Sequence, residues 1–318
     1  MNIKKIGLTA LAASLVSVSA HAGAMSVAGS ASVTIKNNAG TDGGKSITMG
    51  DQLTFTGGGE LDNGLNVALS FVIDHGDADE GTNAFDGHSL TISSDTLGKI
   101  VVAGEGTGNA QSALDTTASG DIWDNGFTHG AAATAYVAMA GSSASDNKSI
   151  NYTFPSIMDD LALTASYSGS TTAIKSTTAW AATYTGIEGL SLSYGTGENG
   201  STASGAEGDV TTMKGSYTMG SFTGAYSNTE SDKAGTGTDE EMTSFKISYT
   251  VTDDLSITYG QDTHETSGQS VDEEFEAVSV SYTTGGMTIT AGQYDASGLA
   301  NTSGNNAERW KLGASFAF

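Results

Sequence analysis

Acidic side chains crowd one stretch of the chain and could bind a metal ion. Asp74, Asp77 and Asp79 lie close together, and carboxylate oxygens are the ligands that Ca²⁺ prefers in proteins. Their spacing does not match an EF-hand loop, and a run of acids most often forms a solvated loop. We therefore expect a solvated acidic loop, with calcium binding as the alternative, and we expect no other cofactor.

The remaining candidates for metal binding or acid–base catalysis are four scattered histidines, His75, His88, His129 and His264. None of them has the paired spacing of a metal or catalytic motif. His129 near Asp124 is the one arrangement that could serve a hydrolase. We expect these histidines on the surface or in loops, and a protein that is not an enzyme.

Composition excludes several classes of protein. The 318 residues include 36 Asp plus Glu against 12 Lys plus Arg, which gives a formal net charge of −24. Such acidity argues against nucleic acid as a partner, because phosphate binding needs a basic surface. The absence of cysteine excludes disulfides, a thiolate nucleophile and cysteine-ligated metal sites.

The first residues read as a secretory leader. Lys4 and Lys5 precede an apolar run that ends in Ala20-His21-Ala22, a small-x-small pattern typical of a cleavage site. The run is shorter than the roughly 20 apolar residues of a membrane-spanning helix. We predict a cleaved signal over residues 1–22 and a single domain over residues 23–318, with a charge of −26 after loss of the two lysines.

Beyond the leader, apolar residues alternate with small or polar ones. In residues 65–73 every odd position is bulky and apolar, and this period of two is the signature of a β-strand. Short connectors such as Asp62-Asn63-Gly64 have turn compositions, whereas residues 74–87, 196–209, 228–241 and 295–307 read as long polar loops. Sixteen strands are predicted, with starts near Ser26, Ser46, Leu65, Gly87, Gly98, Lys148, Leu161, Thr177, Leu190, Thr211, Phe222, Met242, Leu255, Glu276, Met287 and Arg309.

Tyrosines fall at both ends of these strands. One set lies near the short turns and a second set lies where strands reach the long loops; the sets are Tyr152, Tyr184, Tyr217, Tyr249 and Tyr282, and Tyr167, Tyr194, Tyr226 and Tyr259. Two aromatic rings are what the two interfaces of a bilayer require. A soluble β-sandwich would also alternate, but it normally has a larger hydrophobic fraction than the 37 % found here. The sequence favours an all-β, 16-stranded antiparallel transmembrane barrel.

Three segments carry a resemblance to a known family. The final run WKLGASFAF at residues 310–318, FTGGGELDNGLNVALSF at residues 55–71 and NKSINYTFP at residues 147–155 resemble, in order, parts of the trimeric general porins of Gram-negative bacteria. The resemblance covers essentially the whole chain after the leader. It implies an outer-membrane location, a homotrimer, outer-membrane lipids and the barrel-assembly machinery as partners, and a role for Phe318 in the assembly signal.

The resemblance also implies a long third loop, near residues 105–146, that folds into the lumen and narrows it. The carboxylates expected on one wall of the constriction are Glu105, Asp115, Asp121 and Asp124. Strand parity points five basic side chains inward, namely Lys36, Lys214, Lys246, Arg309 and Lys311. Facing charges of opposite sign would create a field across the pore.

The expected function is passive diffusion of small hydrophilic solutes and ions. The strongly negative net charge predicts cation selectivity, because a focused negative potential raises the local cation concentration. The alternative is a structural or adhesive outer-membrane barrel with a plugged lumen, and an open water path past the third loop distinguishes the two.

Overall fold

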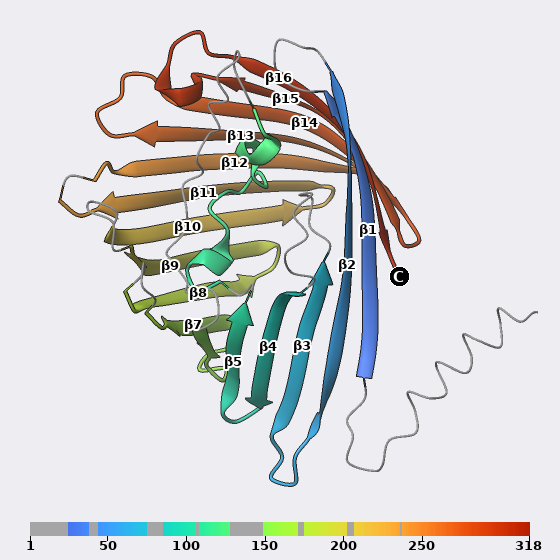
Figure 1. The fold of residues 1–318 in the computed structure, drawn as a ribbon, viewed down its shortest axis with the longest axis vertical. Helices are drawn as coiled ribbons and strands as arrows, with labels where there is room; N and C mark the ends of the chain where they lie inside the picture. Colours follow the sequence, from blue (N-terminus) through green and yellow to red (C-terminus); the bar gives the residue numbers. More distant parts are fainter. Residues whose placement is uncertain are drawn as a thin grey trace, which may run out of the picture.

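Sixteen antiparallel strands close into one barrel (Figure 1). The structure is a computed structural model that describes residues 25–37, 44–74, 85–105, 108–127, 149–170, 175–201, 207–235 and 237–318. The strands are β1 (Met25–Asn37), β2 (Lys45–Glu60), β3 (Asn66–Asp74), β4 (Phe85–Ser94), β5 (Gly98–Glu105), β6 (Ser149–Thr153), β7 (Leu161–Ser168), β8 (Thr177–Ile187), β9 (Leu190–Gly200), β10 (Glu207–Met219), β11 (Phe222–Lys233), β12 (Glu240–Thr252), β13 (Leu255–Thr266), β14 (Glu273–Thr284), β15 (Met287–Ser297) and β16 (Ala307–Ala317). The predicted leader, residues 1–22, lies outside the described residues.

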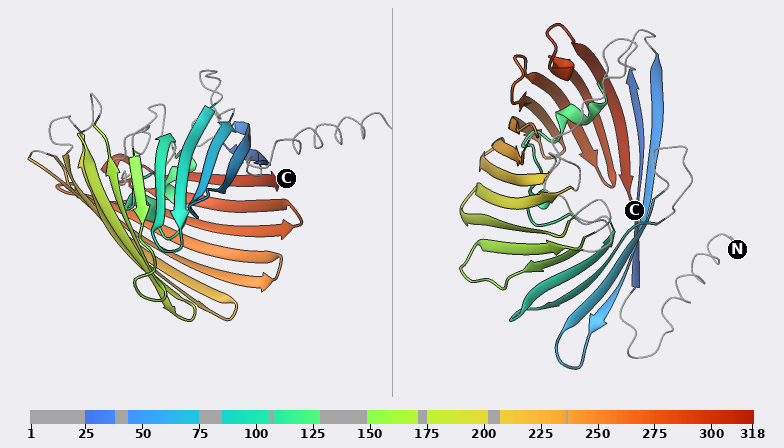
Figure 2. Two further views of the ribbon diagram at one scale, coloured as in Figure 1. Left: turned by 90° about the horizontal axis from the view of Figure 1, so that it is seen from below. Right: turned by 60° about the vertical axis from the view of Figure 1, so that its left-hand side comes forward.

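Each strand pairs with its neighbours in sequence, and β1 also pairs with β16. At the closure, Gly29 N donates to Phe318 O at 2.7 Å and Phe318 N donates to Gly29 O at 2.9 Å. The two ends of the described chain therefore seal the sheet, and Figure 2 shows the C-terminus beside β1. Closure leaves no strand edge unpaired, which is the condition for a sheet to exist in hydrocarbon.

The alternation of apolar and polar residues along the strands gives the barrel an apolar outer face and a polar inner face. Val33 of β1 is opposite Met49 of β2, and Leu53 of β2 is opposite Ile73 of β3. Val33, Met49 and Leu53 are exposed on the outer face, while the residues between them, such as Thr34 and Thr48, face the lumen. The predicted sixteen-stranded antiparallel barrel is confirmed, with an apolar exterior that suits lipid.

Outward tyrosines form two bands. Strands β6 to β14 carry one each, alternately near the short turns and near the long connectors, in the order Tyr152, Tyr167, Tyr184, Tyr194, Tyr217, Tyr226, Tyr249, Tyr259 and Tyr282. These positions match the two interfaces of a bilayer, where aromatic rings with a polar group are favoured.

The short turns lie at one end of the barrel. In the first of them, Gly64 has φ of +80° and Leu65 N donates to Asn63 Oδ1 at 3.2 Å. The Asn-Gly pair therefore makes the tight turn that its sequence predicts, because glycine adopts positive φ without steric cost.

At the other end of the barrel, the prediction of long polar loops is partly wrong. Strands β9 to β12 continue into the segments read as polar loops, so that β9 reaches Gly200, β10 starts at Glu207, β11 reaches Lys233 and β12 starts at Glu240. Paired strands need no apolar side chains outside the bilayer, because their backbone hydrogen bonds do not depend on side-chain type. The loss of apolar alternation therefore marks the point where a strand leaves the bilayer and not the point where it ends.

Helical structure is confined to three short 3₁₀ turns, η1 (Ser112–Leu114), η2 (Ile122–Asn125) and η3 (Leu299–Asn301), in the described ranges. None of the helices within those ranges is long and apolar enough to cross a membrane. The first two turns belong to the connector between β5 and β6, whose described part, residues 108–127, lies inside the barrel.

Candidate functional site

The described part of the β5–β6 connector, residues 108–127, lies against the inner wall; we call it the inner loop. Figure 1 shows it in green across the yellow and orange strands. Ala110 N donates to Ser166 Oγ at 2.8 Å, and Ala118 N and Ser119 N both donate to Ser244 Oγ at 2.9 Å. Small inward hydroxyls on β7 and β12 thus satisfy backbone donors that have no strand partner.

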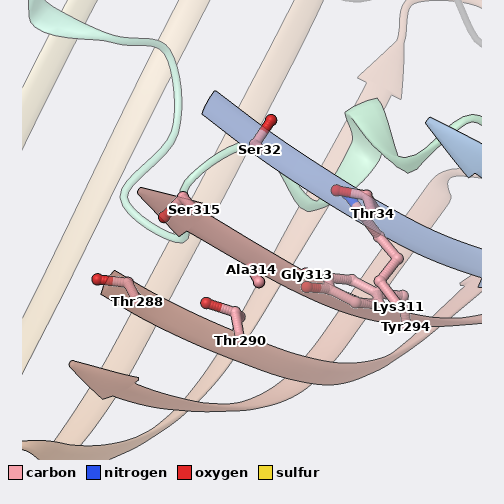
Figure 3. A pocket seen from close by; sticks show the side chains of 9 residues that line it. All are labelled: Ser32, Thr34, Thr288, Thr290, Tyr294, Lys311, Gly313, Ala314 and Ser315. Atoms are coloured by element: carbon pink, nitrogen blue, oxygen red, sulfur yellow. The ribbon is translucent and has the colours of Figure 1, made fainter. Parts of the chain in front are cut away.

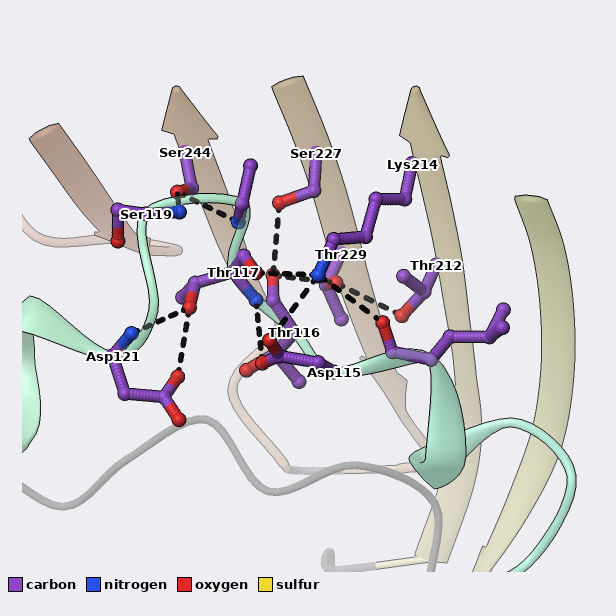
Figure 4. Close-up of polar contacts among 12 residues, drawn as sticks. Asp115, Thr116, Thr117, Ser119, Asp121, Thr212, Lys214, Ser227, Thr229 and Ser244 are labelled. Atoms are coloured by element: carbon purple, nitrogen blue, oxygen red, sulfur yellow. Dashed lines mark hydrogen bonds and ion pairs between the residues drawn. The ribbon is translucent and has the colours of Figure 1, made fainter. Parts of the chain in front are cut away.

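One lysine of β10 binds three groups of the inner loop (Figure 4). Lys214 Nζ lies 3.2 Å from Asp115 Oδ2, 2.8 Å from Thr117 O and 3.4 Å from Leu114 O. Beside it, Thr116 O accepts hydrogen bonds from Ser227 Oγ at 3.2 Å and Thr229 Oγ1 at 3.1 Å. Residues 114–117 are therefore attached to β10 and β11 by charge and by hydroxyl donors.

A buried carboxylate on β13 holds the next part of the inner loop. Asp262 Oδ1 accepts from Ser119 Oγ at 2.6 Å, and Asp262 Oδ2 accepts from Ile122 N at 3.0 Å. The Asp262 side chain is fully buried between wall and loop. Both oxygens have a donor, as a buried carboxylate requires.

Two loop acids shape the loop itself. Asp115 and Asp121 have φ of +59° and +53°, a conformation that aspartate tolerates better than most residues. Thr117 N donates to Asp115 Oδ1 at 3.2 Å, and Thr117 Oγ1 donates to Asp121 Oδ1 at 2.7 Å. Burial raises the pKa of the Asp121 carboxyl above its ordinary value, against the lowering effect of the Thr117 hydroxyl.

An apolar cluster fixes the end of the inner loop. Ile122 and Phe127 pack with Phe275 of β14 and with Leu299 of η3, and the rings of Phe127 and Phe275 have centroids 5.6 Å apart. The cluster joins the inner loop to the β15–β16 connector on the inside of the wall.

Two basic residues of β16 complete the attachment. Arg309 Nη2 donates to Gly126 O at 2.6 Å, and Lys311 Nζ donates to Asn125 Oδ1 at 2.8 Å. Arg309 is buried behind the loop, whereas Asp124 is exposed beside these groups. Three of the five inward basic residues therefore bind the inner loop directly.

The other predicted site residues fall as follows. Lys246 faces the lumen on β12, two strands from Lys214, and Lys36 of β1 is the register partner of Lys311. Glu105 ends β5, and its side chain lies outside the described part of the chain. Phe318 is highly exposed at the end of the barrel wall. The constriction and the assembly signal remain predictions.

The calcium and hydrolase candidates fall mostly outside the described residues. Asp74 ends β3, while Asp77, Asp79 and His129 lie outside. In the part of the chain that is described, no three His, Asp or Glu side chains are grouped so that they could hold a metal ion. Calcium binding stays an untested alternative.

Sequence reasoning missed the buried acids of the inner wall. His264 was expected in a loop or on the surface, and this is wrong: its Nδ1 lies 2.9 Å from Glu273 Oε2, and both side chains are buried. Glu273 Oε1 also accepts from Ala300 N at 2.7 Å. Both Asp262 and His264 lie at positions of β13 whose side chains face the lumen. This alternation could have revealed them, because a lumen-facing residue near the long-connector end of a strand can contact a connector that folds inward.

A closed barrel with an apolar exterior, two aromatic bands and a polar interior defines an outer-membrane β-barrel of the channel-forming class. The model of the Gram-negative porin family matches residues 7–276. The chain therefore belongs to the Gram-negative porin family, and it resides in the outer membrane.

Solved structures show the same fold. An anion-selective porin from Comamonas acidovorans has a TM-score of 0.68 and 14 % identity over 92 % of this chain and 99 % of its own. OmpF of Salmonella typhi, in complex with daunomycin, has a TM-score of 0.70 and 13 % identity over 93 % and 98 %. A trimer form of OmpT from Vibrio cholerae has a TM-score of 0.63 and 16 % identity over 93 % and 100 %. A search of curated protein sequences finds no significant match.

Proposed function

We propose that this protein lets small hydrophilic solutes and ions diffuse passively across the outer membrane. Membership of the porin family supports a passive channel. The observation that carries the proposal is the attachment of the inner loop to one side of the wall, through Ser166, Lys214 and Asp262. A loop held against β7 to β16 narrows the lumen from that side, and the proposal requires water in the remaining cross-section, toward β1 to β5.

Swelling of liposomes that contain the refolded protein tests this proposal. Swelling in isotonic sugars is expected to slow as the sugar grows, because a narrowed water-filled lumen sieves by size. Deletion of the inner loop should admit larger sugars. Liposomes that contain folded protein and do not swell in any sugar would favour the plugged structural or adhesive barrel instead.

We further propose a preference for cations that arises at the mouth, the end of the barrel at which the long connectors lie. Outward carboxylates gather at that end of the strands: Glu198, Asp209, Glu230, Asp232, Glu241, Glu265, Glu274, Glu276, Asp295 and Glu308. Inside, by contrast, basic residues such as Lys214 balance the loop acids. The excess of negative charge thus lies around the mouth, where it concentrates cations before they enter.

Reversal potentials at two salt concentrations test the origin of this preference. Screening lengths fall from about 10 Å at 0.1 M salt to about 3 Å at 1 M, so a preference that arises at the mouth should weaken strongly at high salt. A reversal potential that favours chloride at low salt would overturn the proposal.

We also propose that three copies associate through the outer faces of β1 to β5 and β16. In the described ranges those strands carry no outward tyrosine, although β6 to β14 carry one each. They present aliphatic side chains and the stacked pair Phe55 and Phe71, whose centroids are 4.9 Å apart. An interface between copies does not meet the lipid headgroups and needs no tyrosine band, and one similar structure is described as a trimer form.

An arginine introduced on the outer face of β3 or of β9 distinguishes an interface between copies from a surface that faces lipid. Leu69→Arg on β3 is expected to give monomers in native mass spectrometry, whereas Leu192→Arg on β9 should leave trimers. Both side chains are exposed on the outer surface, so both variants carry a similar cost in lipid, about 2–4 kcal/mol at mid-bilayer. Trimers in both variants would contradict this interface.

A further inference from the structure

A pocket on the inner wall beside the end of the inner loop combines charge, an aromatic hydroxyl and free aliphatic hydroxyls. It has a volume of about 220 Å³ and lies on β1, β15 and β16. Figure 3 shows Ser32, Thr34, Thr288 and Thr290 around the segment of β16 that carries Lys311. The volume is below the roughly 300–1,000 Å³ of pockets for drug-sized ligands, so the pocket suits a single small solute.

Tyr294 is placed in this pocket by a glycine. Its ring lies over Gly292 so closely that a Cβ there would meet the Tyr294 hydroxyl oxygen at 2.8 Å. Gly292 is the register partner of Lys311, and Lys311 Nζ lies 5.7 Å from the centroid of the Tyr294 ring. The glycine lets the phenol lie flat along the wall with the ammonium beside it, which is a favourable cation–π arrangement.

The hydroxyls of the pocket are available to a solute. Those of Ser32, Thr34, Thr290 and Tyr294 form no hydrogen bond with another described residue. Lys311 Nζ uses one of its three hydrogens for Asn125 Oδ1. Several donors and acceptors therefore point at one small volume.

The charges around the pocket favour an anion. Lys36 and Lys311 are direct register partners on β1 and β16, and like charges opposite each other on one face destabilise a sheet. Arg309 is also near Lys311, and the acidic neighbour of this group is the exposed Asp124. An anion beside Lys311 would relieve the repulsion between the two lysines.

We propose that this pocket is a binding subsite for a small polyhydroxylated anion, such as a sugar acid with a single ring. Lys311 binds the carboxylate, with Lys36 adding attraction, and Tyr294, Thr34 and Thr290 bind the hydroxyls. The mouth acids repel chloride and the sugar acid alike, but the subsite gives the sugar acid a residence inside the lumen that chloride, which has no hydroxyls, does not have. The inference rests on the proposed channel function for access of the solute to the pocket.

Glucuronate, glucose and acetate separate charge from hydroxyl recognition. Binding is read in two ways: as solute-induced interruptions of the single-channel current, and by titration calorimetry of the refolded protein in detergent. Glucuronate is expected to bind about tenfold more tightly than glucose, which is the value of one charge-assisted hydrogen bond. Acetate, which has charge without hydroxyls, should bind more weakly than either.

Matched variants locate the site. Lys311→Gln keeps a hydrogen-bond donor for Asn125 and should lower glucuronate affinity about tenfold, to the level of glucose, and Thr290→Val should weaken both sugars about threefold. Lys99→Gln is the control, because Lys99 is an exposed lysine of β5 that faces the lumen away from the pocket.

Three results would overturn the subsite: acetate binding as tightly as glucuronate, equal affinities for glucuronate in Lys311→Gln and Lys99→Gln, or no binding by calorimetry. A protein that binds glucuronate but never conducts would contradict the proposed channel while leaving the subsite in place. A channel that conducts, shows no interruption of its current by glucuronate and does not bind glucuronate would contradict the subsite and leave the proposed channel in place.

Discussion

Lys214 shows how a single side chain positions the inner loop. Its ammonium serves one carboxylate and two carbonyl oxygens of the loop. Lys214→Met keeps the length of the side chain and removes these bonds, so docking of residues 114–117 is expected to weaken by about 1–2 kcal/mol. Larger fluctuations of the open-channel current should follow in planar bilayers.

Lys246→Met is the control for that experiment. Lys246 faces the same lumen from β12 and, in the described part of the chain, forms no hydrogen bond with the inner loop. Equal current noise in the two variants would show that Lys214 does not hold the loop.

Asp262 predicts a graded effect. Asp262→Ala leaves the buried Ile122 N–H without its acceptor, which costs about 1–3 kcal/mol. Asp262→Asn can keep that acceptor and direct its amide to the Ser119 hydroxyl, so its effect is expected to be smaller. Hydrogen exchange of the amides in residues 108–127 should rise from the native protein to Asn to Ala, and identical rates in all three would contradict the role of Asp262.

Asp121 gives the inner loop a pH dependence. Burial raises its pKa above the ordinary value of 3.8, so on acidification it loses its charge at a higher pH than an unperturbed aspartate. Because the folded protein holds this proton more tightly than the unfolded chain, the contribution of Asp121 to the free energy of unfolding increases as pH falls through the raised pKa.

Loss of the Asp121 charge should therefore remove a small part of the cation preference above pH 3.8, in addition to the contribution of the mouth, and Asp121→Asn should abolish that pH-dependent part. Reversal potentials measured from neutral to acidic pH check this, with Asp62→Asn at an exposed short turn as the control. A pH-dependent part that persists in Asp121→Asn belongs to another carboxylate.

At the scale of elements, the apolar cluster couples two connectors. Leu299 of η3 is fully buried against Phe275, in a cluster that also holds Ile122 of the inner loop. Leu299→Ala is expected to cost about 2–5 kcal/mol and to increase hydrogen exchange in both connectors. Leu61→Ala, at an exposed turn, should change neither, and exchange confined to residues 298–306 would show that the connectors are independent.

The strands were predictable because their apolar residues have a strict period, and the starts of β5, β7, β8, β9, β11, β13 and β15 agree with the structure to the residue. The ends of β9 to β12 near the long connectors were not predictable, because polar strands outside the lipid have the composition of loops. Parity predicted which basic residues face inward. It could not show that Lys214, Arg309 and Lys311 bind the inner loop, because residues 106–147 have no period from which to place a partner.

At the scale of the whole molecule, the strongly negative charge and the balanced lumen belong to different regions. Net charge alone predicted cation selectivity, but the fold places many acids on the outer face near the mouth. Lysines and an arginine meanwhile hold the inner loop. We therefore expect that ion preference, solute sieving and solute binding can be altered separately by substitutions in three regions.

The conductance of the refolded protein in a planar bilayer, under a salt gradient, tests the central claim most directly. An open lumen beside the docked inner loop predicts stepwise conductance, in groups of three for a trimer, with a reversal potential that favours cations at low salt. Folded protein that inserts and does not conduct would contradict the account, because it would mean that the lumen beside the docked inner loop is closed.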